Sequence, residues 1–115
     1  MTLRQRQSLF ARRVADLIRE AERLGYDVTL GEAWRSPEEA ERLAAAGKGI
    51  RNSLHCQRLA IDLNLFKDGV WLKNTPAYER LGVWWELQST DDLRWAWGGR
   101  FGDGNHFSLS HGGRR

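Results

Sequence analysis

The sequence has little cysteine and no long hydrophobic run, and each scarcity excludes a class of structure. A single cysteine, Cys56, among 115 residues excludes an internal disulfide and a cysteine-based zinc knuckle, and it agrees with a reducing compartment. No apolar run approaches the roughly 20 residues of a membrane-spanning helix. We therefore expect no stable association with a membrane.

A secretory signal and internal repeats are also missing. Residues 1–8 lack the apolar stretch and the small-residue cleavage site of a signal peptide, so we expect the chain to be made and first held in the cytoplasm. There is no low-complexity segment or interior linker. A length of 115 residues then predicts one domain, residues 1–115, with any active site built from its own core.

The composition is that of a compact soluble fold, with 41% hydrophobic residues, 29% charged residues and six tryptophans. Eighteen Lys and Arg against fifteen Asp and Glu give a net charge of +3. This mild positive balance favours an anionic partner such as a nucleic acid, a membrane surface or a bacterial cell wall. Charge alone does not choose among them.

Capping patterns predict three helices. Thr2 and Gln5 could form a capping box before a helix that ends near Gly25. Acidic residues are mixed among the arginines of its polar face, which favours a solvated face over a nucleic-acid stripe. Ser36 and Pro37 open a second helix that runs to about residue 46. The third helix starts at residues 74–76 and continues to about residue 87.

Alternating and β-branched segments predict the strands: 26–30, 59–66, 70–72, 94–97 and 106–109. Asp68-Gly69 predicts a turn that joins the second and third of these strands in a hairpin. Because helices and neighbouring antiparallel hairpins do not alternate as βαβ units, the fold class is α+β, with a small antiparallel sheet flanked by helices.

One strand carries a carboxylate on its polar face. Ala60, Asp62 and Asn64 share that face, whereas the neighbouring residues are apolar. His55 lies in the preceding loop, and His106 begins a strand after the glycine-rich loop 98–105. Two imidazoles and one carboxylate can hold a catalytic zinc ion and leave a fourth position for water, although such a spacing alone is weak evidence for a metal.

Three motifs in this order make the pattern specific. They are Trp34-Arg35-Ser36-Pro37-Glu38-Glu39, the spacing of Ser53, His55, Arg58, Ala60 and Asp62, and the segment 97–107. Together they resemble the zinc D-alanyl-D-alanine carboxypeptidases and L-alanyl-D-glutamate endopeptidases, a VanY-like family of LAS-type metallopeptidases, and most of all its short phage-endolysin branch. The resemblance covers nearly the whole chain and implies the hedgehog/DD-peptidase zinc fold.

The resemblance also implies residue roles. His55, Asp62 and His106 would bind one Zn²⁺ per chain, Asp103 would be the catalytic acid/base, and Arg35 would bind the substrate carbonyl or carboxylate. Ser53 would be a supporting polar contact at the mouth of the site. The residues themselves suggest two further substrate contacts: Arg58, a cation toward an acidic peptide, and Trp97, a stacking wall. For Trp97 a place in the core is the alternative, since alternating Trp in a strand usually packs inside.

Two positions depart from the family pattern. Relatives usually carry Gly where this chain has Arg58, and many use Glu rather than Asp at the position of Asp103. Two further residues are left out of the site: Cys56, since adjacent residues do not easily turn both side chains toward one metal, and His111, which lies in the C-terminal tail.

The function that the resemblance implies is that of a zinc-dependent endopeptidase of the bacterial peptidoglycan stem peptide, cutting the L-alanyl-D-glutamate bond. We expect a monomeric phage or prophage endolysin with no separate cell-wall-binding domain and no nucleic-acid partner. It would stay in the host cytoplasm until a holin releases it to the wall. The alternatives are a D-alanyl-D-alanine carboxypeptidase or dipeptidase, and a non-catalytic basic module that binds nucleic acid or cell wall.

Overall fold

The first helix is capped as the sequence predicts. In the computed structural model, which describes residues 1–114, the Thr2 hydroxyl accepts a hydrogen bond from Gln5 N at 3.1 Å, and Gln5 Oε1 accepts one from Thr2 N at 2.8 Å. This capping box satisfies backbone donors that the first turn leaves free. Leu24 caps the other end, and Gly25 turns the chain away with a φ of 92°.

The described residues form three α-helices, namely α1 (Leu3–Arg23), α2 (Pro37–Ala45) and α3 (Glu79–Glu86). Their strands are β1 (Asp27–Leu30), β2 (Ala60–Lys67), β3 (Val70–Leu72), β4 (Trp95–Trp97) and β5 (His106–Leu109). Three short 3-10 helices complete the described chain, namely η1 (Leu54–Gln57), η2 (Thr75–Tyr78) and η3 (Gly98–Phe101). The predicted α+β class with a small antiparallel sheet is confirmed.

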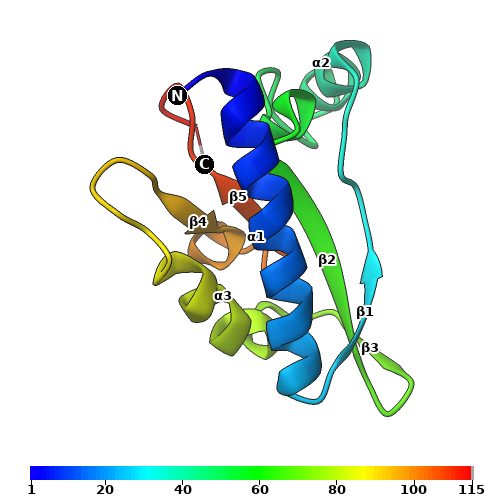
Figure 1. The fold of residues 1–115 in the computed structure, drawn as a ribbon. Coiled ribbons are helices and arrows are strands. Elements are labelled where there is room, and N and C mark those ends of the chain that lie inside the picture. Colours follow the sequence, from blue (N-terminus) through cyan, green and yellow to red (C-terminus); the bar gives the residue numbers. More distant parts are fainter. Residues whose placement is uncertain (115) are drawn as a thin grey trace.

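β2 is the central strand of the sheet (Figure 1). The strand order is β1-β2-β5-β4, and β3 also pairs with β2; all the pairings are antiparallel. Asp68 and Gly69 join β2 to β3 with φ angles of 52° and 78°, the positive values that a tight two-residue hairpin turn requires. β5 pairs with residues 60–62 at the start of β2, so side chains from both strands lie close together at this end of the sheet.

α1 crosses one face of the sheet and closes the hydrophobic core (Figure 1). Trp85 of α3 lies at its centre, fully buried, with edge-to-face contacts to Trp95 and Phe107 at centroid distances of 5.1 and 5.7 Å. The Trp85 indole N–H donates to the Ser108 carbonyl at 3.0 Å, so its polar atom is satisfied as well. The opposite face of β2 is left for the polar side chains.

The third predicted helix begins differently from the prediction. Asn74 caps it as expected, with Oδ1 accepting from Ala77 N at 3.0 Å, but the first turn is the 3-10 helix η2 and α3 starts only at Glu79. The Tyr78 hydroxyl donates to the Leu72 carbonyl at 2.7 Å and accepts from Leu65 N at 3.1 Å. We attribute the tighter turn to these two bonds, which tie Tyr78 to the β2–β3 hairpin.

No helix within residues 1–114 is long and apolar enough to cross a membrane.

Candidate metal centre

His55 is held by a short helix rather than by the loop that the sequence predicts. It lies in η1, and the Ser53 hydroxyl accepts a hydrogen bond from His55 N at 3.2 Å at the start of that helix. Ser53 and His55 are both buried, with exposed fractions of 5% and 3%. Arg58 caps the end of η1, and its φ of 57° lies in the left-handed region and turns the chain into β2.

Asp62 and His106 are brought together by strand register. They are direct partners in the pairing of β2 with β5, so their side chains lie on the same face of the sheet. The Asp62 backbone is bonded on its other edge, where Gly31 N donates to Asp62 O at 2.7 Å and Asp62 N donates to Glu32 O at 2.9 Å. The position of the carboxylate is therefore fixed from both sides.

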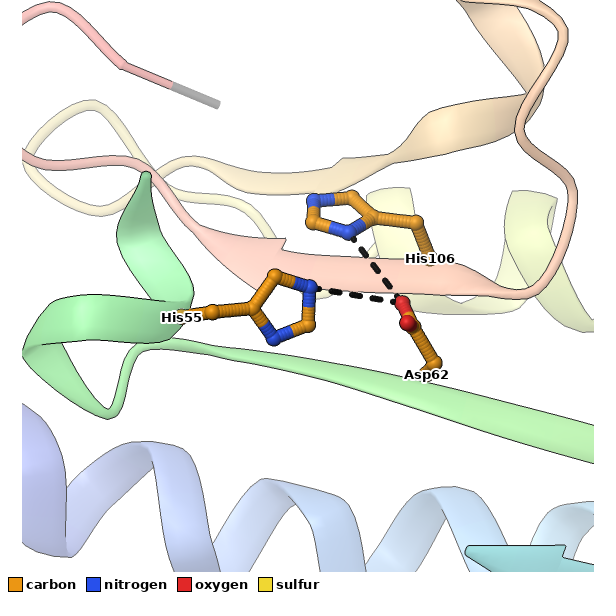
Figure 2. A group of neighbouring side chains, drawn as sticks. All are labelled: His55, Asp62 and His106. Carbon is orange, nitrogen blue, oxygen red and sulfur yellow. Dashed lines mark ion pairs between the residues drawn. The ribbon is translucent and has the colours of Figure 1, made fainter. Parts of the chain in front are cut away.

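The three side chains converge on one point (Figure 2). Asp62 Oδ1 lies 3.4 Å from His55 Nε2 and 3.5 Å from His106 Nδ1, and the three ligand atoms lie within 4.8 Å of one another. Ligands about 2.0–2.1 Å from a tetrahedral ion are roughly 3.4 Å apart. Asp62 Oδ1 is buried without a hydrogen-bond partner among the described residues, so a metal ion fits both the spacing and the unpaired oxygen.

The electrostatics of the cluster keep Asp62 ready to bind a cation. Burial by itself would raise the pKa of its carboxyl, but the imidazoles of His106 and His55 outweigh burial and lower that pKa to about 2. Asp62 therefore stays ionised throughout the neutral and mildly acidic range. Two nitrogens and one carboxylate oxygen are a donor set that zinc accepts, as do other divalent ions.

Asp103 lies beside the cluster, on the loop that leads into β5. Asp103 N donates to Gly98 O at 2.9 Å, and His106 N donates to Asp103 O at 3.2 Å, so one tight turn positions both residues. A Cβ at Gly98 would collide with the Asp103 carbonyl and come within 2.7 Å of His106 Cβ, which explains the glycine. Although Asp103 is exposed overall, partial desolvation raises the pKa of its carboxyl, and the charge of Asp62 adds to the rise.

These residues line a cleft of about 240 Å³. Arg35 and Ser53 line it together with Asp103 and the three clustered residues, as does the ring of Phe101, which is 55% exposed. The guanidinium of Arg35 is largely buried, with 14% of the side chain exposed. The structure thus brings the predicted ligands, the predicted acid/base and the predicted cation into one site.

Glu32 is a site residue that the sequence analysis missed. Its Oε1 lies 2.5 Å from Arg35 Nη2 and 3.7 Å from His55 Nδ1. The second distance is too long for a full hydrogen bond, but His55 Nδ1 is buried and has no hydrogen-bond partner among the described residues. A carboxylate behind a metal-binding histidine orients the ring and favours the tautomer whose other nitrogen is free to bind. The only signal in the sequence is an acidic residue three positions before Arg35.

Replacing Glu32 by Gln is expected to weaken zinc binding about tenfold or more, the scale of such supporting contacts. Glu39→Gln is the matched control, because Glu39 pairs with Arg42 at the same 2.5 Å and the same sequence spacing without touching a histidine. Competition with a chelator of known affinity measures the effect. Equal zinc affinities for the Glu32→Gln variant and the wild type would show that the carboxylate does not support His55.

Two residues predicted to contact substrate lie away from the cleft. The Arg58 guanidinium stacks over the exposed Trp34 ring at 4.9 Å and lines a separate apolar hollow beside α1. Trp97 is buried, 4% exposed, and its indole N–H donates to the Gly104 carbonyl at 2.7 Å. Trp97 therefore takes its alternative place in the core, where it supports the loop that carries Asp103.

The two residues left out of the predicted site remain outside the cluster. The Cys56 thiol is half-buried and faces the Ser36 carbonyl, with Sγ 3.9 Å from that oxygen. His111 forms an isolated β-bridge with Arg114. Neither residue belongs to the group of possible metal ligands formed by His55, Asp62 and His106.

The fold and the cluster define a class of protein: the chain is a metallopeptidase, with a His-Asp-His group that could hold a metal ion on one face of an antiparallel sheet. A family profile described as D-alanyl-D-alanine carboxypeptidase matches residues 46–109, more than half of the chain, and the chain belongs to that family. The match includes all three clustered residues and Asp103.

A solved structure supports the same assignment. The crystal structure of the Serratia marcescens L-Ala D-Glu endopeptidase ChiX is similar to this chain with a TM-score of 0.66 and 25% sequence identity. The similarity covers 82% of this chain and 75% of that one. No curated protein sequence matches the chain.

Proposed function

We propose that the chain is a zinc-dependent peptidase of bacterial peptidoglycan that cuts the bond between L-alanine and D-glutamate in the stem peptide. The observation that carries the proposal is the convergence of His55, Asp62 and His106 beside Asp103 and Arg35 in one cleft. The likeness to an L-Ala D-Glu endopeptidase favours this bond over the terminal D-alanyl-D-alanine bond.

The residues of the cleft have separate roles in amide hydrolysis. A zinc ion held by His55 Nε2, Asp62 Oδ1 and His106 Nδ1 would act as a Lewis acid on the scissile carbonyl. Asp103 accepts the proton of the attacking water and returns it to the leaving amine; its raised pKa brings it closer to the range in which it can do both. Arg35 binds the carbonyl oxygen or a nearby carboxylate and offsets the charge that develops there.

We further propose a monomeric phage or prophage endolysin that waits in the host cytoplasm and reaches the wall through a holin. A nucleic-acid partner is not expected. Arg13 and Arg19 both pair with Asp16 along α1, and Arg23 pairs with Glu20, so acidic residues interrupt the arginines of this helix and break up a continuous basic stripe. A mild net charge of +3 still suits an anionic wall.

Digestion of a defined muropeptide by the zinc-loaded protein tests the proposed bond. Mass spectrometry of the products should show a new amino-terminal D-glutamate. Release of D-alanine alone would instead assign the chain as a D-alanyl-D-alanine carboxypeptidase. Zinc-loaded protein that leaves both bonds intact would overturn the peptidase proposal and favour a binding module.

A further inference from the structure

A second hollow of about 250 Å³ adjoins the cleft of the metal centre. Its walls come from the end of the β2–β3 hairpin and the start of η2 on one side, and from residues 102–105 on the other. Asp103 lines both hollows, whereas the three clustered residues line only the first. Asp103 therefore stands at the boundary between the metal centre and this second hollow.

The walls of the second hollow are tightly built. Gly104 packs against Thr75 so closely that a Cβ on the glycine would lie 2.7 Å from Thr75 Cα. The Asn105 amide donates to Asn64 Oδ1 at 3.2 Å, and the Asn105 carbonyl accepts from Leu63 N at 2.9 Å. These contacts fix the loop directly after Asp103, so the hollow is a formed feature of the fold.

Among the described residues 1–114, Lys73 is the only cation that lines this hollow. Its ammonium group lies over the Trp71 ring, 4.7 Å from the centroid. A cation–π contact of this kind restrains a flexible side chain without neutralising its charge. Within residues 1–114 Lys73 forms no ion pair, so the hollow, which Asn74 also lines, offers a free ammonium group to an anionic group of a ligand.

We propose that the second hollow binds the amino-acid residue on the leaving-amine side of the scissile bond, and that Lys73 pairs with the carboxylate of that residue. The inference rests on the proposed function, in which Asp103 returns a proton to the leaving amine. The residue that bears this amine must then lie on the Asp103 side of the metal centre. Both D-glutamate and a terminal D-alanine carry a free carboxylate there.

The test compares Lys73→Met with Lys67→Met on two peptides. Lys67 is the matched control because it is exposed in the same hairpin and lies over the Tyr26 ring, 5.4 Å from its centroid, yet does not line the hollow. One peptide contains the L-alanyl-D-glutamate bond with the glutamate carboxylate free, and the other carries a carboxamide at that position. KM and kcat are measured for each pair, with zinc content as a check on the metal centre.

For the free carboxylate we expect Lys73→Met to raise KM about fivefold, the scale of an exposed ion pair, with kcat and zinc content unchanged. For the carboxamide, KM of this variant should equal that of the wild type. An equal rise for both peptides, no rise for either, or the same rise in Lys67→Met would overturn the role of Lys73. If the zinc-loaded wild type cuts neither peptide, the proposed function itself fails and this inference falls with it.

Discussion

Replacing His55 or Asp62 by alanine should remove the bound zinc and reduce peptidase activity by about a thousandfold or more. The size follows from the several kcal/mol of transition-state stabilisation that a catalytic metal supplies, since each 1.36 kcal/mol is tenfold in rate. Each variant deletes one of three ligand atoms that lie within 4.8 Å of one another. Elemental analysis after dialysis should find about one zinc per chain in the wild type and much less in the variants.

His111→Ala is the matched control for this experiment. His111 is a half-buried histidine outside the cluster, so its removal should leave both zinc content and activity unchanged. Circular dichroism of all variants shows whether they remain folded. Folded His55→Ala and Asp62→Ala proteins that keep stoichiometric zinc would contradict the assignment of the ligands, and a wild type without zinc after reconstitution would contradict the metal centre as a whole.

The second large effect is expected at Asp103. Asp103→Asn keeps the shape of the side chain but cannot accept the proton of water, and a missing acid/base group costs about 10²–10⁴ in rate. Because Asp103 does not belong to the metal-ligating group, zinc content should stay at the wild-type level. The expected result is thus a loss of kcat with zinc retained, which separates this variant from the two ligand variants.

Asp103→Glu provides the conservative comparison, since glutamate keeps the carboxylate group at this position. It should recover part of the activity that Asp103→Asn loses, with the difference from aspartate set by the longer reach of the side chain. Activity of Asp103→Asn close to that of the wild type would show that another group transfers the proton. Identical losses in both variants would indicate that Asp103 matters for the loop rather than for the chemistry.

Arg58 shows how a departure from the family pattern can be understood from the backbone. Its φ of 57° is a conformation that glycine adopts freely and that costs other residues roughly 1–2 kcal/mol. The glycine expected here from the family resemblance would suit this turn between η1 and β2. Here the arginine keeps the turn, and its guanidinium stacks over Trp34, outside the cleft.

Local sequence chemistry determined the elements of the fold and the kinds of residues in the site. The capping box of Thr2 and Gln5, the Ser36 cap and the Asp68-Gly69 turn all form as predicted, because each depends on contacts within a few residues. The alternation along β2 likewise places Asp62 opposite the apolar face. These features need no knowledge of the rest of the chain.

Only the tertiary structure decided how the site is assembled. It set the register that makes His106 the direct partner of Asp62, put Glu32 between Arg35 and His55, and placed Asp103 between two hollows. None of this follows from periodicity, because a shift of one residue between strands distant in sequence leaves each strand's own pattern intact while it reverses the face of every side chain. The packing of the whole sheet against α1 selects the register that buries the apolar face and leaves the possible metal ligands together.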